Sequence, residues 1–120
     1  SNYILHDEIV SSFGDEGAAN YTRFSTDQYS KGAHLFVYGR SIDSNPVFRF
    51  PIRQSLESSQ VIARTHELRL DSVLGALQDS DSISKGVFHN DVVSVGNEKL
   101  FLLHESTFQN QIAVLKELMN

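Results

Sequence analysis

Short apolar runs recur along the chain, and their spacing predicts alternating strands and helices. Residues 33–38 (AHLFVY) form a nearly continuous apolar run closed by Gly39, which is typical of a strand buried on both faces. Residues 47–50 predict a second, shorter extended piece that ends at Pro51. Residues 54–66 carry apolar side chains at helical spacing and predict a helix. Residues 72–77 fit either a short strand or one helical turn.

The second half of the chain predicts a hairpin followed by a helix. The polar residues 78–85 are interpreted as a loop, and residues 87–104 as two strands joined by a tight turn at Gly96 and Asn97. Residues 106–109 match a capping box, in which the side chains of Ser106 and Gln109 satisfy backbone amides at a helix start. The helix that follows is expected to pack an apolar stripe on the sheet: Phe108, Ile112, Leu115 and Met119.

The N-terminal third is less regular. Residues 1–2 are set aside as a possible tag remnant, and residues 3–13 are interpreted as a short strand or an irregular edge. Residues 14–20 predict a loop in which two glycines surround two carboxylates, and residues 20–32 a structured loop with interspersed aromatic side chains. The order of elements indicates one domain over residues 1–120, of the α/β or α+β class, with helices covering a mostly apolar sheet.

Composition narrows the function classes. The chain has 120 residues, 40% of them apolar and 21% charged, which suits one small globular domain. The net charge is −5 and the basic residues are scattered, so nucleic-acid binding is not expected. No apolar run has the length of a membrane span and no signal peptide opens the chain, so we expect a cytoplasmic protein without a membrane partner. The absence of cysteine excludes disulfides, thiolate ligands and a cysteine nucleophile within this chain.

His89 and Asp91 are the candidate chemistry of the predicted hairpin. In an extended strand, side chains two residues apart point to the same face, so an imidazole and a carboxylate would stand side by side. The alternative is an ordinary exposed strand face. The spacing of the five histidines is not typical of metal ligands, so no metal site is expected. These residues are His6, His34, His66, His89 and His104. No other cofactor is expected either.

Three stretches, in this order, resemble the succinylarginine dihydrolase family. They are residues 14–20 (GDEGAAN), residues 35–64 with the runs LFVYGR, PIRQ and ES…VIAR, and residues 86–97 (GVFHNDVVSVGN). The resemblance implies the pentein fold of guanidine-modifying enzymes, in which five ββαβ units surround a pseudo-fivefold axis. This chain would be a middle segment of about two such units, and residues 72–77 would then be a strand.

The resemblance also implies a chemistry. Family members hydrolyse the guanidino group of N2-succinylarginine to N2-succinylornithine, ammonia and carbon dioxide, with a cysteine nucleophile and a histidine that moves protons. Motif by motif, Glu16 and His89 match catalytic residues, and Arg53 and Asp91 match substrate-binding residues. These types suit the task, because a carboxylate accepts two guanidinium donors in plane, histidine titrates near neutrality, and arginine pairs with carboxylates.

One departure from the family limits what this chain can do. The family's cysteine lies beyond the matched stretches, so the chain is expected to be a segment without hydrolase activity of its own. The expected partner is the small-molecule substrate. The parent enzyme is expected to be a homodimer, and the isolated segment to self-associate through surfaces that neighbouring units would cover. The alternative function is a small acidic binding or inhibitor protein of the immunity type.

Overall fold

The computed structural model of the chain describes residues 18–40, 54–87 and 89–120. The predicted elements over residues 3–13 and 47–50, and residues 14–17 of the first motif, lie outside this part of the chain. Along the described residues a three-stranded sheet, a two-stranded sheet and helices form a mixed α+β structure. The coarse fold class predicted from the sequence is therefore confirmed.

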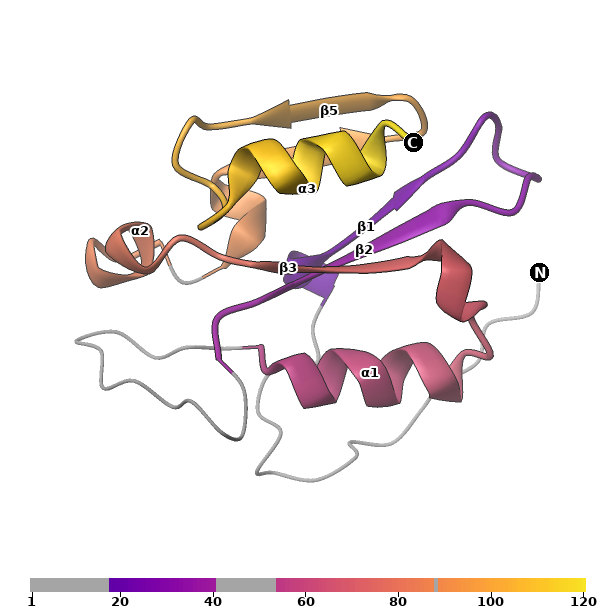
Figure 1. Cartoon of the computed structure of the whole chain (residues 1–120), viewed down its shortest axis with the longest axis horizontal. Coiled ribbons are helices and arrows are strands. Elements are labelled where there is room, and N and C mark those ends of the chain that lie inside the picture. Colours follow the sequence, from indigo (N-terminus) through magenta and orange to yellow (C-terminus); the bar gives the residue numbers. More distant parts are fainter. Residues whose placement is uncertain (1–17, 41–53, 88) are drawn as a thin grey trace.

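The larger sheet has the strand order β1-β2-β3, with β2 in the centre. β1 (Tyr21–Phe24) pairs antiparallel with β2 (Ala33–Tyr38), and β3 (Val73–Leu77) pairs parallel with β2. Helix α1 (Leu56–Thr65) makes the crossover between the two parallel strands. Figure 1 shows α1 on one side of this sheet. On the other side lie α3 (Gln111–Leu118) and the hairpin of β4 (Ser94–Asn97) and β5 (Leu100–Leu103).

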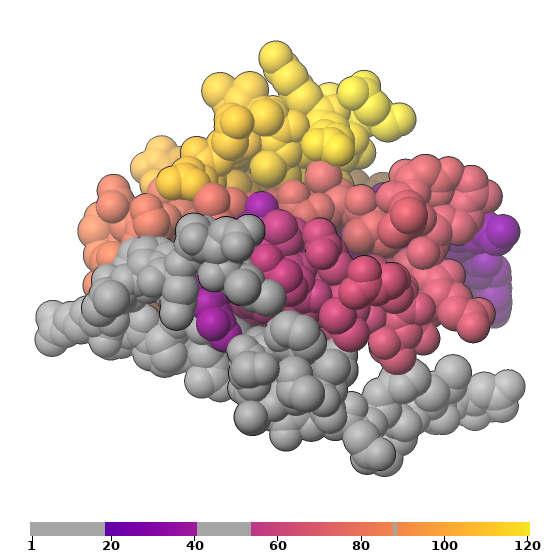
Figure 2. Space-filling view, turned by 60° about the horizontal axis from the view of Figure 1, so that its bottom comes forward, coloured from indigo at the N-terminus to yellow at the C-terminus, as the bar shows by residue number. Residues whose placement is uncertain are grey.

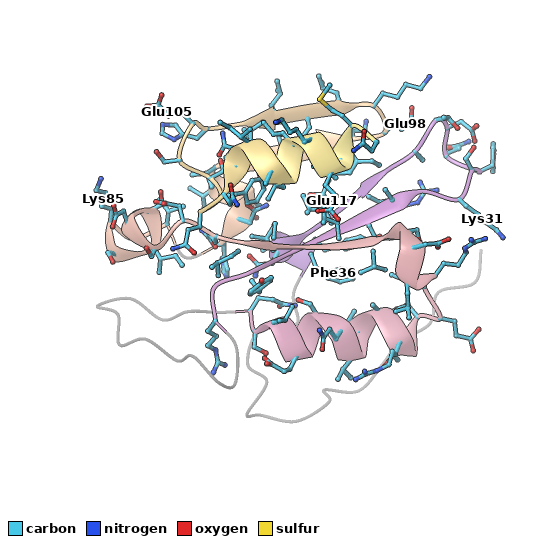
Figure 3. The ribbon with its side chains drawn as sticks, viewed as in Figure 1. Lys31, Phe36, Lys85, Glu98, Glu105 and Glu117 are labelled. Atoms are coloured by element: carbon cyan, nitrogen blue, oxygen red, sulfur yellow. The ribbon has the colours of Figure 1, made fainter. Side chains whose placement is uncertain are left out.

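The centre of β2 is buried on both faces, as its continuous apolar pattern predicts. Leu35, Phe36 and Val37 are 0%, 3% and 1% exposed. Leu35 and Val37 belong to a core cluster with Ala76 and Phe108, against which side chains of the hairpin and α3 pack. Phe36 extends from the opposite face, between the sheet and α1 (Figure 3). One strand thus supplies the core to two layers.

The predicted helix over residues 54–66 is confirmed as α1. Ser55 caps it, because its Oγ accepts a hydrogen bond from the Ser58 N–H at 3.1 Å. The chain entering the helix is tied to the end of β2, where the Leu56 N–H donates to the Arg40 carbonyl at 2.9 Å. Residues 73–77 form the strand β3 rather than a helical turn, which agrees with the family resemblance. In Figure 2, α1 (magenta) and the C-terminal residues (yellow) lie on different parts of the surface, with β3 and helix α2 (Ser80–Ser84) between them.

Two polar stretches that were predicted to be loops contain regular structure. Residues 21–24 form β1, whose backbone pairs with β2 despite its mixed polar composition. Residues 80–84 form helix α2 (Ser80–Ser84), so the predicted loop over residues 78–85 is wrong. The reason is a side-chain cap: the Asp79 carboxylate accepts from the Ser82 N–H at 2.9 Å and from its hydroxyl at 3.0 Å.

The predicted hairpin exists but is shorter and turns later. β4 (Ser94–Asn97) pairs antiparallel with β5 (Leu100–Leu103), and Asn97 faces Leu100, so the two-residue turn is Glu98-Lys99. Glu98 takes the positive φ of 50° that this turn requires. Gly96 has a different role, inside β4. A Cβ there would lie 2.5 Å from Thr22 Cγ2, so glycine lets the hairpin approach β1.

The C-terminal helix begins later than the capping-box pattern predicts. α3 starts at Gln111, and the Gln111 Oε1 accepts from the N–H groups of Thr107 and Phe108. The predicted apolar stripe is wrong for two of its members, because Ile112 is 71% and Met119 is 86% exposed. Phe108 is buried ahead of the helix, and Val114 and Leu118 are the helix residues that pack on the core cluster.

Candidate active site

Two of the four candidate site residues lie in the described part of the chain. His89 and Asp91 can be placed, whereas Glu16 and Arg53 fall outside the described residues. If both residues are catalytic, as the family resemblance implies, Glu16 must lie close to His89, and this remains a prediction.

His89 and Asp91 do not lie on a strand, so the alternation argument for their shared face is wrong. His89 has an extended backbone, with φ −111° and ψ 137°, and is followed by the single 3-10 turn η4 (Asn90–Val92). The turn forms because the Val93 N–H donates to the Asn90 carbonyl at 3.0 Å and the Val92 N–H to the His89 carbonyl at 3.4 Å. His89 precedes this turn and is half-buried, whereas Asp91 lies within the turn and is exposed.

Asn90, between them, is the buried centre of this turn. It is 1% exposed, and its Nδ2 donates to the Ser94 hydroxyl at 2.5 Å. Its backbone N–H donates to the Oδ1 of Asn20 at 3.0 Å. Asn20 ends the short turn η2 (Ala18–Asn20) and is 2% exposed. The end of the first family motif and the centre of the third are thus in direct contact.

Sequence reasoning missed the contact between Asn20 and Asn90. Both belong to stretches that carry the family resemblance, but no periodicity or spacing marks a contact across 70 residues. Their buried amides are only partly satisfied: in the described structure the Asn20 Nδ2 and the Asn90 Oδ1 have no hydrogen-bond partner. Such atoms are uncommon in folded proteins and call for a physical reason.

The far end of the turn is also fixed. The Val93 carbonyl accepts from the His104 N–H at 2.8 Å and from the Thr107 hydroxyl at 3.2 Å. Thr107 is fully buried, at 0% exposed. The segment from His89 to Ser94 is therefore held by η2 on one side and by the chain leaving β5 on the other.

A shallow pocket of about 390 Å³ opens between η4 and the hairpin. Its lining is mostly apolar, with Val93, Leu102 and Leu103, and it carries the polar groups of Asp91 and His104. An exposed carboxylate can bind a planar cationic group through paired hydrogen bonds, and the adjacent apolar surface can pack against the aliphatic part of the same ligand.

A second titratable pair lies on the α1 side of the sheet. The Tyr21 hydroxyl and the His34 Nδ1 are 2.7 Å apart, and their rings are stacked. Burial lowers the pKa of His34, and the nearby Arg23 charge lowers it further. Burial raises the pKa of Tyr21. Both effects keep this pair neutral near pH 7.

Other site classes have no support in the described residues. Within the described ranges no three His, Asp or Glu side chains gather closely enough to hold a metal ion. No helix among the described residues is long and apolar enough to cross a membrane.

Comparison with known proteins identifies the family. The succinylarginine dihydrolase family model matches residues 1–120. The chain belongs to the succinylarginine dihydrolase family. It is 45% identical over 125 residues to the N-succinylarginine dihydrolase of Shewanella piezotolerans, with 98% of this chain covered and 28% of the relative. It is 49% identical over 122 residues to that of Hahella chejuensis, with 97% and 27% covered.

A third relative, the N-succinylarginine dihydrolase of Pseudomonas fluorescens, is 47% identical over 112 residues, with 91% of this chain and 25% of the relative covered. The chain thus spans about a quarter of the length of the curated relatives it matches. The resemblance read from the three motifs is confirmed, as is the interpretation of the chain as a segment of a succinylarginine dihydrolase. The alternative of an immunity-type binding protein gains no support from these relatives.

Proposed function

We propose that this chain supplies the acid–base residue and a guanidinium contact to a hydrolase that converts N2-succinylarginine to N2-succinylornithine, ammonia and carbon dioxide. The observation that carries the proposal is the family match over the whole chain, since its relatives are named for this reaction. The placement of His89 and Asp91 on either side of the buried Asn90 in one tight turn supports it.

His89 moves protons in this proposal. Its imidazole donates a proton to the departing ammonia and then accepts one from the attacking water, the usual cycle of a general acid–base residue. The half-buried position of His89 allows contact with a substrate in a partly dry environment. The hydrogen-bonded turn that follows His89 restricts its backbone, so less conformational entropy is lost when the imidazole reaches the transition-state geometry.

Asp91 binds the guanidinium group. A guanidinium presents its N–H donors in a planar fork, and a carboxylate accepts two of them side by side. Asp91 is exposed and lines the pocket between η4 and the hairpin, so a cationic substrate can reach it. Desolvation on closing the site would strengthen this pair.

Glu16 and Arg53 complete the contribution of this chain. Glu16 acts beside His89, where its carboxylate orients the imidazole and stabilises its charged form. Glu16 lies only four positions before Asn20 in the sequence, a chain length of at most about 14 Å. Asn20 in turn contacts the residue after His89. Arg53 pairs with a carboxylate of the succinyl or amino-acid part of the substrate.

The nucleophile comes from another part of the full-length protein. This chain contains no cysteine, so the isolated segment has no hydrolase activity in this proposal. Its elements form about two ββαβ units of a pentein propeller in a cytoplasmic, dimeric enzyme. The β2–α1–β3 crossover is compatible with such a unit.

The test compares the segment with the full-length gene product. Each is incubated with N2-succinylarginine and, separately, with arginine, and ammonia and N2-succinylornithine are measured. The proposal predicts ammonia from N2-succinylarginine with the full-length protein only, and much less from arginine. A full-length protein that releases no ammonia from N2-succinylarginine contradicts the proposed function. Ammonia released by the segment alone contradicts the assignment of the nucleophile elsewhere.

A further inference from the structure

We propose that Asn20 is a positioning residue, which fixes the peptide group between His89 and Asn90 and thereby directs the His89 and Asp91 side chains into the active site. The inference rests on the proposed function, which gives the two positioned residues their task. Asn20 itself does not contact the reacting atoms in this account.

The peptide group that joins His89 to Asn90 is held at both of its polar ends. Its N–H donates to the Asn20 Oδ1 at 3.0 Å, and its carbonyl accepts from the Val92 N–H at 3.4 Å. A peptide group is planar, so two hydrogen bonds on opposite sides define its orientation. The backbone from which the His89 side chain extends is thereby fixed.

A second hydrogen bond holds the same turn to the hairpin. The Asn90 Nδ2 donates to the Ser94 hydroxyl at 2.5 Å, and Ser94 is 6% exposed at the start of β4. The turn is therefore fixed between η2, which is early in the chain, and β4. Asp91 leaves the middle of this turn, so its direction is set by the same two contacts.

The burial of the two asparagines argues against a role in packing alone. Asn20 is 2% and Asn90 is 1% exposed, and one amide atom of each has no partner in the described structure. A buried polar atom without a partner lowers the stability of the fold, whereas an apolar side chain of similar volume would avoid that loss. Leucine at position 20 would pack, but it would leave the Asn90 N–H without an acceptor. Asparagine at position 20 therefore contributes its Oδ1 as the hydrogen-bond acceptor for the Asn90 N–H.

The experiment uses full-length enzyme that carries one of three substitutions. Asn20→Leu removes the acceptor, Asn20→Asp keeps an oxygen in its place, and Ala63→Gly is the control. Ala63 is 2% exposed in α1 and makes none of these contacts, so its substitution reports general destabilisation of the fold. For each variant we would measure the thermal midpoint, kcat and KM for N2-succinylarginine, and the pH profile of kcat/KM.

Asn20→Leu is expected to lower kcat about 10- to 100-fold, the cost of a small displacement of a catalytic group, with KM changed less than about threefold. Its pH profile should shift, because the surroundings of His89 change. Asn20→Asp should recover most of the lost kcat, and Ala63→Gly should keep the wild-type kcat and pH profile. An Asn20→Leu variant whose kcat and pH profile match those of Ala63→Gly overturns the proposal and leaves Asn20 a structural residue.

Asn20→Ala is the second variant, in case Asn20→Leu does not fold. It removes the same acceptor without adding a larger apolar side chain, and kcat is expected to fall about 10- to 100-fold. An unchanged kcat in a folded Asn20→Ala enzyme overturns the proposal. The wild-type control separates the two ideas: no ammonia release by wild type refutes both, whereas an active wild type with an unaffected Asn20→Leu variant refutes only the positioning role.

Discussion

The Asn20 side chain accepts a hydrogen bond from the Asn90 backbone at 3.0 Å, across 70 residues of sequence. This contact joins the end of the first family motif to the centre of the third. Asn90 lies between His89 and Asp91 in the sequence. The contact therefore brings these two candidate site residues close to η2, which follows Glu16 in the chain. Long-range pairing of this kind builds a site from loops on a rigid scaffold.

Asp91→Asn is expected to weaken catalysis while leaving the fold intact. The change keeps the size of the side chain but removes the charge that pairs with the substrate guanidinium. We expect kcat/KM of the full-length enzyme for N2-succinylarginine to fall about 10- to 100-fold, the cost of one charge-assisted hydrogen bond. Asp81→Asn, at an exposed position of α2, is the control and should leave kcat/KM unchanged. Equal kinetics for the two variants would remove Asp91 from the substrate site.

Gly96→Ala is expected to destabilise the fold by about 1–3 kcal/mol. The added Cβ would lie 2.5 Å from Thr22 Cγ2 and 2.8 Å from Phe24 Cε1, so the hairpin must move away from β1. Urea unfolding of the purified protein measures the change. Gly75→Ala is the matched control. A Cβ added at Gly75 would lie 3.4 Å from its nearest neighbour, Tyr38 Cε1, which is an ordinary packing distance. A loss at Gly75 as large as that at Gly96 would show that backbone freedom, rather than crowding, matters at both positions.

Ser55→Ala should cost about 1 kcal/mol of folding free energy, because it removes the acceptor for the Ser58 N–H at the start of α1. Asn110→Ala provides the comparison. Asn110 occupies the same position before α3 but makes no side-chain capping bond, so its loss should be close to zero. Denaturation midpoints of the two variants measure this difference. A larger loss at Asn110 than at Ser55 would contradict the capping geometry.

His34 should make the fold sensitive to mild acid. Its pKa in the folded state lies below the ordinary 6.5, first because of burial and then because of Arg23. The unfolded chain therefore binds the proton more tightly, and the stability present above about pH 6.5 is lost as the pH falls toward the folded-state pKa. His34→Phe should flatten this part of the stability profile in thermal unfolding at several pH values.

Tyr21→Phe is the control for the His34 prediction. It removes the hydroxyl that contacts the His34 Nδ1 but leaves the ring that helps to bury the imidazole. Since burial is the main cause of the lowered His34 pKa, the acid sensitivity should persist in this variant. Its disappearance would assign the effect to the hydrogen bond.

The sequence was sufficient for elements whose signal is local. The continuous apolar run of β2 and the helical spacing of α1 each predict their structure, because burial and periodicity act within a few residues. The start of α3 shows the limit of such reasoning. The Thr107 hydroxyl, in the middle of the capping-box pattern, donates to the carbonyls of Val93 and His104, and the helix begins only at Gln111.

The family was predictable from the motif around His89 and Asp91, but the local geometry of that motif was not. The motif around His89 and Asp91 leads to the family, yet the strand assumed for it is a 3-10 turn. That turn depends on hydrogen bonds from Asn90 to Asn20 and to Ser94, the first of which spans most of the chain. Alternation of polar and apolar residues cannot report such a contact, because it records only local periodicity.

His89→Ala in the full-length enzyme tests whether His89 is the proton-transfer residue of a succinylarginine dihydrolase. Ammonia release from N2-succinylarginine is followed at saturating substrate and compared with wild type, after a thermal midpoint has confirmed that the variant is folded. We predict a fall in kcat of at least about 100-fold, the usual contribution of general acid–base catalysis. A folded His89→Ala enzyme with kcat near that of wild type would contradict the account.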